Sequence, residues 1–165
     1  SLLIRYKGSY QQALSIINQS AEGLPEPTAG WVASSSSLRI VALAATGQQS
    51  EANELIEQLG NGEPSRWIEM LEQLTMLASQ SSMEITKRIG ALQVETIELL
   101  SKRIESEDDD FKRRWEFQRA LSLSYAGQTD KAIASFKQLA TQNPKSGIIQ
   151  RGYGNVLLDS EKSSE

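Results

Sequence analysis

The stretch GQTDKAIASFKQLATQNP, residues 127–144, contains a skeleton of four residues that the chain uses three times. Each copy has a glycine, an alanine, a bulky apolar residue and a proline, separated by identical intervals. The three copies are Gly8, Ala13, Ile17 and Pro25; Gly47, Ala52, Ile56 and Pro64; and Gly127, Ala132, Phe136 and Pro144. Equal intervals at three places predict a repeat protein, in which one structural unit recurs along the chain.

The copy that begins at Gly127 shows the local chemistry of the unit. Glycine adopts a left-handed backbone easily, so it can close one helix, and Thr129 or Asp130 is expected to cap the next. The apolar residues that follow fall at helical spacing on one face: Ala132, Ile133, Phe136, Leu139 and Ala140. Proline at 144 then disfavours a helical conformation for the residue before it. One unit is therefore helix, turn, helix and proline break.

The same punctuation divides the whole chain into helices. The predicted helices lie near 9–21, 28–46, 48–60, 64–79, 83–106, 109–126, 129–142 and 145–159, after a partial helix at 1–7. Asp159 is expected to close the last of them. No stretch keeps the two-residue alternation of a strand, so we expect an all-α chain of about eight to nine helices.

A less regular unit is expected between the second and third copies. The three glycines stand 39 and then 80 residues apart, so the second interval is wide enough for two units. The hidden unit would start at Pro64 and continue through a second helix at 83–106, where Gly90 or Ala91 offers a small contact residue. It lacks the glycine and proline markers of the other copies.

On these residues the chain resembles the tetratricopeptide repeat family, whose unit is usually about 34 residues. The resemblance implies a right-handed superhelix of antiparallel helical hairpins. The glycines then match the turn between the paired helices, the alanines match the small residue of the second helix, and Ile17, Ile56 and Phe136 match its bulky partner. In the first helices, Ala120 and Leu123 match a packing pair, and Gly154 and Leu157 match the same pair in the last helix.

The resemblance also predicts how the chain is organised. We expect residues 1–165 to form one solenoid segment, with both ends inside a repeat, as in a piece of a longer chain. Its parts are a partial repeat at 1–25, repeats at 28–64 and 109–144, a degenerate repeat at 65–106 and a partial repeat at 145–165.

Composition argues against several classes of function. The 165 residues carry a formal net charge of −4 and contain no histidine and no cysteine. The commonest general base, the commonest metal ligand and the thiolate nucleophile are therefore missing, and we expect no enzyme, no cofactor and no metal site. Scattered basic residues predict no nucleic-acid partner, and no apolar run is long enough for a membrane span. The compartment stays open between cytoplasm and cell envelope.

In the family the first helices of successive units line a concave groove that binds ligands. The resemblance places these partner-binding residues there: Arg114, Phe117, Leu121, Tyr125, Arg151 and Asn155. It also places Ser34, Ser37, Val41, Ala45, Ile148 and Asp159 in the groove. Aromatic contacts and arginines that bind carboxylates suit a peptide. The alternative is that Phe117 and Leu121 are core residues and that both arginines are solvated.

We therefore expect a non-catalytic scaffold that binds a peptide or protein segment in its groove. Two alternatives stay open: a structural or regulatory arm of a larger protein, and a solenoid pocket for a saccharide or other small ligand. Self-association is also possible, because a terminal repeat without a capping helix exposes an apolar face.

Two further patterns have structural interpretations. The acidic run at 105–110 precedes a predicted helix, so it is expected to cap that helix rather than bind calcium. The basic stretch at 112–114 lies beside those acids and makes a poor track for phosphates. Three tryptophans, Trp31, Trp67 and Trp115, stand near the starts of predicted first helices and are expected to pack between repeats.

Overall fold

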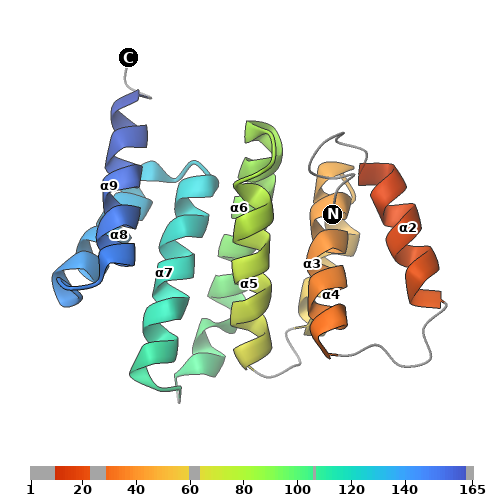
Figure 1. The fold of residues 1–165 in the computed structure, drawn as a ribbon, viewed down its shortest axis with the longest axis horizontal. Coiled ribbons are helices and arrows are strands. Elements are labelled where there is room, and N and C mark those ends of the chain that lie inside the picture. The colour runs from red at the N-terminus through yellow and green to blue at the C-terminus, as the bar shows by residue number, and fades with distance from the viewer. Residues whose placement is uncertain (1–9, 23–28, 60–63, 106, 163–165) are drawn as a thin grey trace. The chain divides into compact units, whose positions relative to one another are not determined.

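The computed structural model describes residues 10–22, 29–59, 64–105 and 107–162 (Figure 1). Within these ranges the chain forms eight α-helices and one short 3-10 helix, and no strand. The helices are α2 (Tyr10–Glu22), α3 (Ala29–Ala45), α4 (Gln49–Leu59), α5 (Pro64–Ala78), α6 (Met83–Leu100), η1 (Ser101–Ile104), α7 (Asp109–Tyr125), α8 (Thr129–Gln142) and α9 (Gly147–Lys162). The prediction of an all-α chain is confirmed, while the partial helix expected at 1–7 lies outside the described residues.

Two helices, α6 and α9, differ most from their predicted bounds. The helix expected at 83–106 ends as an α-helix at Leu100 and continues only as the 3-10 helix η1. The last helix begins at Gly147 and extends beyond Asp159, so the prediction that Asp159 closes it is wrong. Its start is later than expected because Pro144 lies in a turn, which the amide of Ser146 closes by donating to the Asn143 carbonyl at 3.1 Å.

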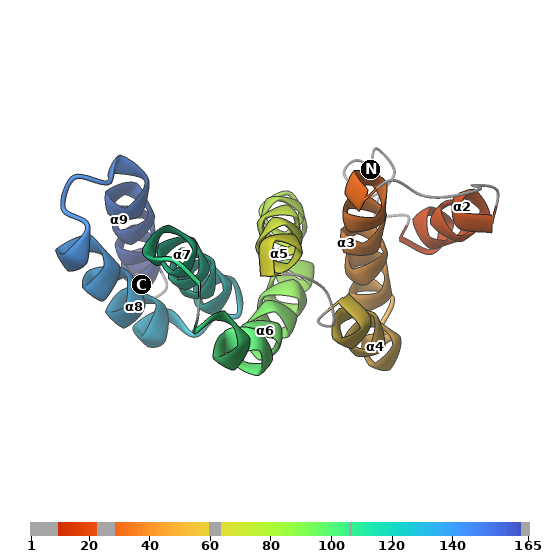
Figure 2. The same cartoon turned by 90° about the horizontal axis from the view of Figure 1, so that it is seen from below.

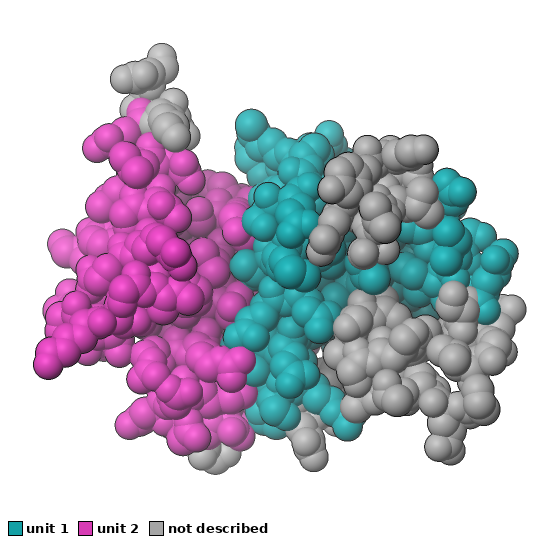
Figure 3. Space-filling view, viewed as in Figure 1, with its two compact units in different colours: residues 1–89 teal, residues 90–165 magenta. Residues whose placement is uncertain are grey.

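The chain divides into two compact units, residues 1–89 and residues 90–165 (Figure 3). The boundary falls inside α6, within the repeat that lacks the glycine and proline markers. Each unit has its own helix contacts and its own buried residues, so each is described by itself.

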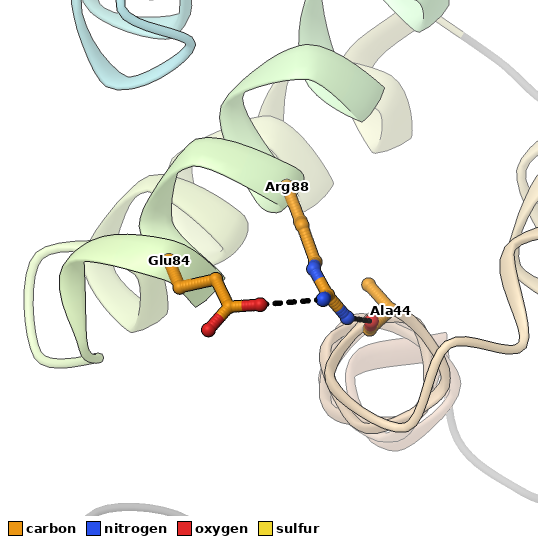
Figure 4. Close-up of polar contacts among 3 residues, drawn as sticks. All are labelled: Ala44, Glu84 and Arg88. Atoms are coloured by element: carbon orange, nitrogen blue, oxygen red, sulfur yellow. Dashed lines mark hydrogen bonds and ion pairs between the residues drawn. The ribbon is translucent and has the colours of Figure 1, made fainter.

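In unit 1, α3 is the central helix and contacts α2, α4 and α5. Its segment from Ile40 to Ala44 is apolar throughout, and none of these five side chains is more than 3% exposed. A helix that is apolar all round its surface is stable only when neighbours cover it all round. Arg88 of α6 adds a polar contact, donating from Nη1 to the Ala44 carbonyl at 3.4 Å and pairing with Glu84 at 2.6 Å (Figure 4).

Unit 2 is built on α7, α8 and α9, with α8 in contact with both other helices (Figure 2). Ala132 and Phe136 of α8 are fully buried, as the repeat skeleton predicted. Phe136 meets Phe117 of α7 edge-on, with ring centroids 5.8 Å apart. An edge-to-face pair of this kind adds about 0.5–1.5 kcal/mol to the burial of the two rings. The predicted apolar face of residues 132–140 therefore forms the core of this unit.

The turn between α7 and α8 has the geometry that the glycine predicted. Gly127 has φ of 76°, in the left-handed region that a residue with a Cβ enters only at a cost. The amide of Gln128 donates to the Leu123 carbonyl at 2.9 Å, and the amide of Gly127 donates to the Ser124 carbonyl at 3.0 Å. These two bonds are the Schellman motif, which satisfies carbonyls at the end of a helix.

The turn between α3 and α4 repeats this motif eighty residues earlier. Gly47 has φ of 79°, the amide of Gln48 donates to the Leu43 carbonyl at 2.9 Å, and the amide of Gly47 donates to Ala44 at 3.2 Å. The two helical hairpins are thus closed by the same bonds at equivalent residues. This local equivalence supports the repeat that the sequence predicted.

The expected cap of α8 is wrong. Neither Thr129 nor Asp130 is the N-cap, because Gln128 occupies that position and makes no side-chain capping bond. The left-handed turn at Gly127 explains the difference. It leads the chain directly into the helix, so that Thr129 is already the first helical residue.

Candidate partner-binding face

The predicted groove residues of α7 lie on one side of that helix. The buried residues of α7 are Trp115, Gln118, Ala120, Ser122 and Leu123, and none of the predicted groove residues is among them. Asp108 fixes the start of the helix, since its side chain accepts from the amide of Phe111 at 2.8 Å. The prediction that the acidic run caps a helix is thereby confirmed at Asp108.

The predicted groove residues of α7 and α9 define a surface that we call the α7–α9 face. Its residues are Arg114, Phe117, Leu121 and Tyr125 of α7, and Ile148, Arg151, Asn155 and Asp159 of α9. Arg114, Ile148, Arg151, Asn155 and Asp159 have exposed side chains. Phe117 and Leu121 are partly buried and pack against the core of unit 2. The face therefore has a half-buried apolar base on α7 and exposed polar or charged groups around it.

A glycine brings α9 close to this base. A Cβ on Gly152 would stand 2.7 Å from Cε1 of Phe136 and 3.3 Å from Cε2 of Phe117. No real Cβ makes a contact as short as the first, so the two rings occupy the space that a side chain at this position would need. A glycine inside a predicted helix is a sequence signal for such a close approach, but Gly152 was not among the predicted repeat markers.

Tyr125 and Asp159 interact at the other end of the face. Burial raises the pKa of the Tyr125 phenol, and the Asp159 carboxylate raises it further by disfavouring a second negative charge. Phe117 lies beside Gly152, and eight residues later Tyr125 lies within electrostatic range of Asp159. From the first contact to the second, the residue numbers rise in both helices, so α7 and α9 run parallel along the face.

Among the described residues of unit 1, the predicted groove positions of α3 do not form an equivalent face. Ser37 and Val41, predicted as groove residues, are both fully buried, so that prediction is wrong for them. The physical reason is that α2, α4 and α5 all pack on α3 and cover this part of the helix. Ala45 is partly buried, and the side chain of Ser34 lies outside the described residues.

The alanine and bulky apolar repeat markers are buried or partly buried, as expected of packing residues. Ala13, Ala52 and Ile56 are buried, and Ile17 is partly buried. Pro64 is the first residue of α5. Gly8 and Pro25 lie outside the described residues.

Only some of the small residues that were predicted as contact residues in α6 and α9 make close contacts. In α6, Gly90 is the one that packs closely, while Ala91 is exposed. In α9, a Cβ on Gly154 would meet nothing within 4 Å, and Leu157 is 36% exposed. The matching residues of α7 are buried because α8 covers them, whereas none of the described elements covers this side of α9.

Two of the tryptophans are buried. Trp67 is 3% exposed and Trp115 is fully buried, where its indole nitrogen donates to the Ser101 hydroxyl at 3.3 Å. A buried ring cannot stack on a nucleic-acid base. The side chain of Trp31 lies outside the described residues.

One feature of unit 2 was not predicted. A hollow lies between the start of α7 and the end of α8, lined by Asp109, Lys112, Arg113, Glu116, Leu139, Gln142 and Asn143. Its walls carry charges of both signs, and most of the lining side chains are exposed. Among the described residues, no three acidic side chains are grouped so that they could hold a metal ion.

No family model, curated protein or solved structure matches this chain. The tetratricopeptide resemblance therefore stays a prediction that rests on the repeat markers and on the helical hairpins. None of the described helices is both long and apolar enough to cross a membrane.

Proposed function

We propose that the chain is a non-catalytic scaffold of the tetratricopeptide type, which binds a segment of another protein on the α7–α9 face. In this proposal the successive hairpins form a right-handed superhelix, and α7 and α9 are first helices of neighbouring repeats. The face would then be part of the concave groove of the superhelix.

The observation that carries the proposal is the register between α7 and α9. Gly152 of α9 lies against the ring of Phe117 of α7, 35 residues earlier in the chain, which is close to the usual length of one unit in the family. The groove-facing positions of two units would therefore lie side by side. They offer partly exposed aromatic and aliphatic surface beside exposed arginines, a combination typical of protein-binding surfaces.

Site-directed photo-crosslinking tests this proposal. A photoreactive benzoyl-phenylalanine replaces Asn155 on the face or, as a matched control, Lys137, which is exposed on α8 outside the face. Both forms are expressed in the organism of origin and irradiated, and the crosslinked proteins are identified by mass spectrometry. We expect a protein that is captured from position 155 and not from position 137.

A second variant makes the test specific to the chemistry of the face. Arg151→Glu reverses an exposed charge beside Asn155 and should abolish the crosslink while the circular dichroism spectrum stays helical. If positions 155 and 137 capture the same proteins, or if position 155 captures none, the face is not a partner-binding surface.

A further inference from the structure

One side of α9 has no cover among the described helices, although the matching residues of α7 are covered. Gly154 follows Ala120 of α7 by 34 residues, and the same interval separates two leucines, Leu123 and Leu157. Ala120 and Leu123 are buried in the core of unit 2. Leu157 is exposed, and a Cβ on Gly154 would meet nothing within 4 Å. Leu158 beside them is 56% exposed. We call Gly154, Leu157 and Leu158 the outer side of α9.

The outer side of α9 is separate from the α7–α9 face. Leu157 and Asn155 are two residues apart, so their side chains leave the helix about 160° apart. The inward side of α9, with Ile149 and Val156, belongs to the core of unit 2. A partner on the outer side would therefore not occupy the α7–α9 face.

The cover of α7 shows what kind of structure fits these residues. Ala120 and Leu123 share one buried cluster with Ala132 and Phe136 of α8. Ala132 and Phe136 are four residues apart, so a small and a bulky side chain lie one turn apart on the same face of α8. The distance between two packed helices depends on the side chains at their contact, so a small residue permits a close approach. The matching residues of α9 therefore suit a helix with the same pair.

Helix stability does not explain the glycine on the outer side. Glycine is less favourable than alanine inside a helix. At Gly152 the rings of Phe117 and Phe136 occupy the space of a side chain and account for the glycine. No described residue does so at Gly154. A closely packed partner helix would account for it.

A folded second copy of the chain offers no such helix among its described residues. The small and bulky pair recurs in α4 and α8, and in both helices the chain itself buries it. The four residues are Ala52, Ile56, Ala132 and Phe136. In α2 the alanine of the pair, Ala13, is buried as well. The occupant of the outer side is therefore sought in a different protein.

We propose that the outer side of α9 binds an amphipathic helix of a different protein, which carries a small residue and, four residues later, a bulky apolar residue. The small residue would lie close to Gly154, and the bulky residue would pack against Leu157 and Leu158. This site goes beyond the proposed function, because it uses a side of α9 that the α7–α9 face does not include.

The probe is a synthetic peptide with the sequence of α8, residues 129–142, which carries the pair at its native spacing. A covalent link between the exposed positions 134 and 138 holds the peptide helical, because a free helix of this length is marginal in water. Fluorescence anisotropy measures binding of the labelled peptide to the full chain. We expect saturable binding, and about tenfold weaker binding when the peptide carries Ala132→Leu, which removes its small residue.

Two variants of the chain locate the binding site. Gly154→Leu fills the space left for the partner and should weaken binding of the peptide about tenfold. Its circular dichroism spectrum should stay helical, since a Cβ at this position meets no other residue within 4 Å. Lys137→Leu is the matched control, because it adds the same side chain at an exposed position of α8 and should leave the binding unchanged.

Three results would overturn the inference. The first is no binding of the peptide at a chain concentration of about 1 mM. The second is binding that Gly154→Leu leaves unchanged, which would place the peptide elsewhere, for example on α7 in place of α8. The third is a dimer of the chain in sedimentation equilibrium that Gly154→Leu dissociates, which would assign the outer side to a second copy. Each of them leaves the crosslinking test of the α7–α9 face unaffected.

Discussion

Gly90 of α6 lies so close to the end of α7 that a Cβ on it would stand 2.4 Å from the amide nitrogen of Ala126. The carbonyl carbon of Tyr125 would be 2.6 Å away. These obstacles are backbone atoms, so they cannot move aside as the tip of a flexible side chain can. The approach of α6 to α7 therefore depends on the missing side chain at position 90.

Gly90→Ala should destabilise the protein because the methyl group has no space. Overpacking of this kind costs about 1–3 kcal/mol, and the rigid backbone neighbours favour the upper part of that range. Urea denaturation followed by circular dichroism measures the change in the free energy of unfolding.

Gly154→Ala is the matched control, because Gly154 is also inside a helix but a Cβ there would meet nothing within 4 Å. Alanine is favoured over glycine in a helix by about 0.5–1 kcal/mol, so this substitution should stabilise the protein. Equal effects of the two substitutions would show that the close approach at Gly90 is not present.

The two Schellman turns predict a pair of equal effects. Gly47→Ala and Gly127→Ala each force a residue with a Cβ into a left-handed conformation, which costs about 1–2 kcal/mol. Because the turns share the same bonds, the two losses in the free energy of unfolding should agree within about 0.5 kcal/mol. Urea denaturation of both single variants checks this, and a much smaller loss at Gly47 would contradict the equivalence of the hairpins.

Much of the local fold could be predicted from the sequence because its signals are local. A glycine after an apolar helix, as at Gly47 and Gly127, predicts a left-handed turn. An apolar face at helical spacing, as in α8, predicts burial of that face. These features depend on residues within a few turns of one another. Apart from the C-terminal ends of α6 and α9, the predicted helix ends therefore lie within two residues of the observed ones.

The failures concern contacts between helices that are distant in the sequence. Gly152 and Gly154 are both glycines in α9, and only the position of the rings of Phe117 and Phe136 decides which one is a contact residue. Likewise, Ser37 was predicted to line a groove, but the covering of α3 by its neighbours buries it. Periodicity identifies the faces of a helix without stating what covers each of them.

The capping role of Asp108 predicts a difference between neighbouring acids. Asp108→Ala removes the bond to the amide of Phe111 and should lower the free energy of unfolding by about 1 kcal/mol. Asp109→Ala is the control, since Asp109 lies in the first turn and should contribute only about 0.3–0.5 kcal/mol through the helix dipole. Thermal unfolding of both variants measures the difference, and equal losses would mean that the cap does not form.

The Tyr125–Asp159 interaction predicts a dependence of stability on alkaline pH. The pKa of Tyr125 is raised above its usual value of 10.0 in the folded chain, so the folded state keeps the phenol proton longer than the unfolded state does. The contribution is therefore fully present below pH 10 and is lost as the pH rises through the folded pKa. Asp159→Asn should lower the pKa of Tyr125, although burial keeps it above the usual value.

The pKa of Tyr125 can be measured by the ultraviolet absorption of its phenolate. The chain has four tyrosines, so the titration of a Tyr125→Phe variant is subtracted to isolate this residue. The same subtraction in the Asp159→Asn background gives the pKa without the carboxylate. An unchanged pKa would show that Asp159 lies too far from Tyr125 to act on it, which would contradict the approach of these two residues at this end of the face.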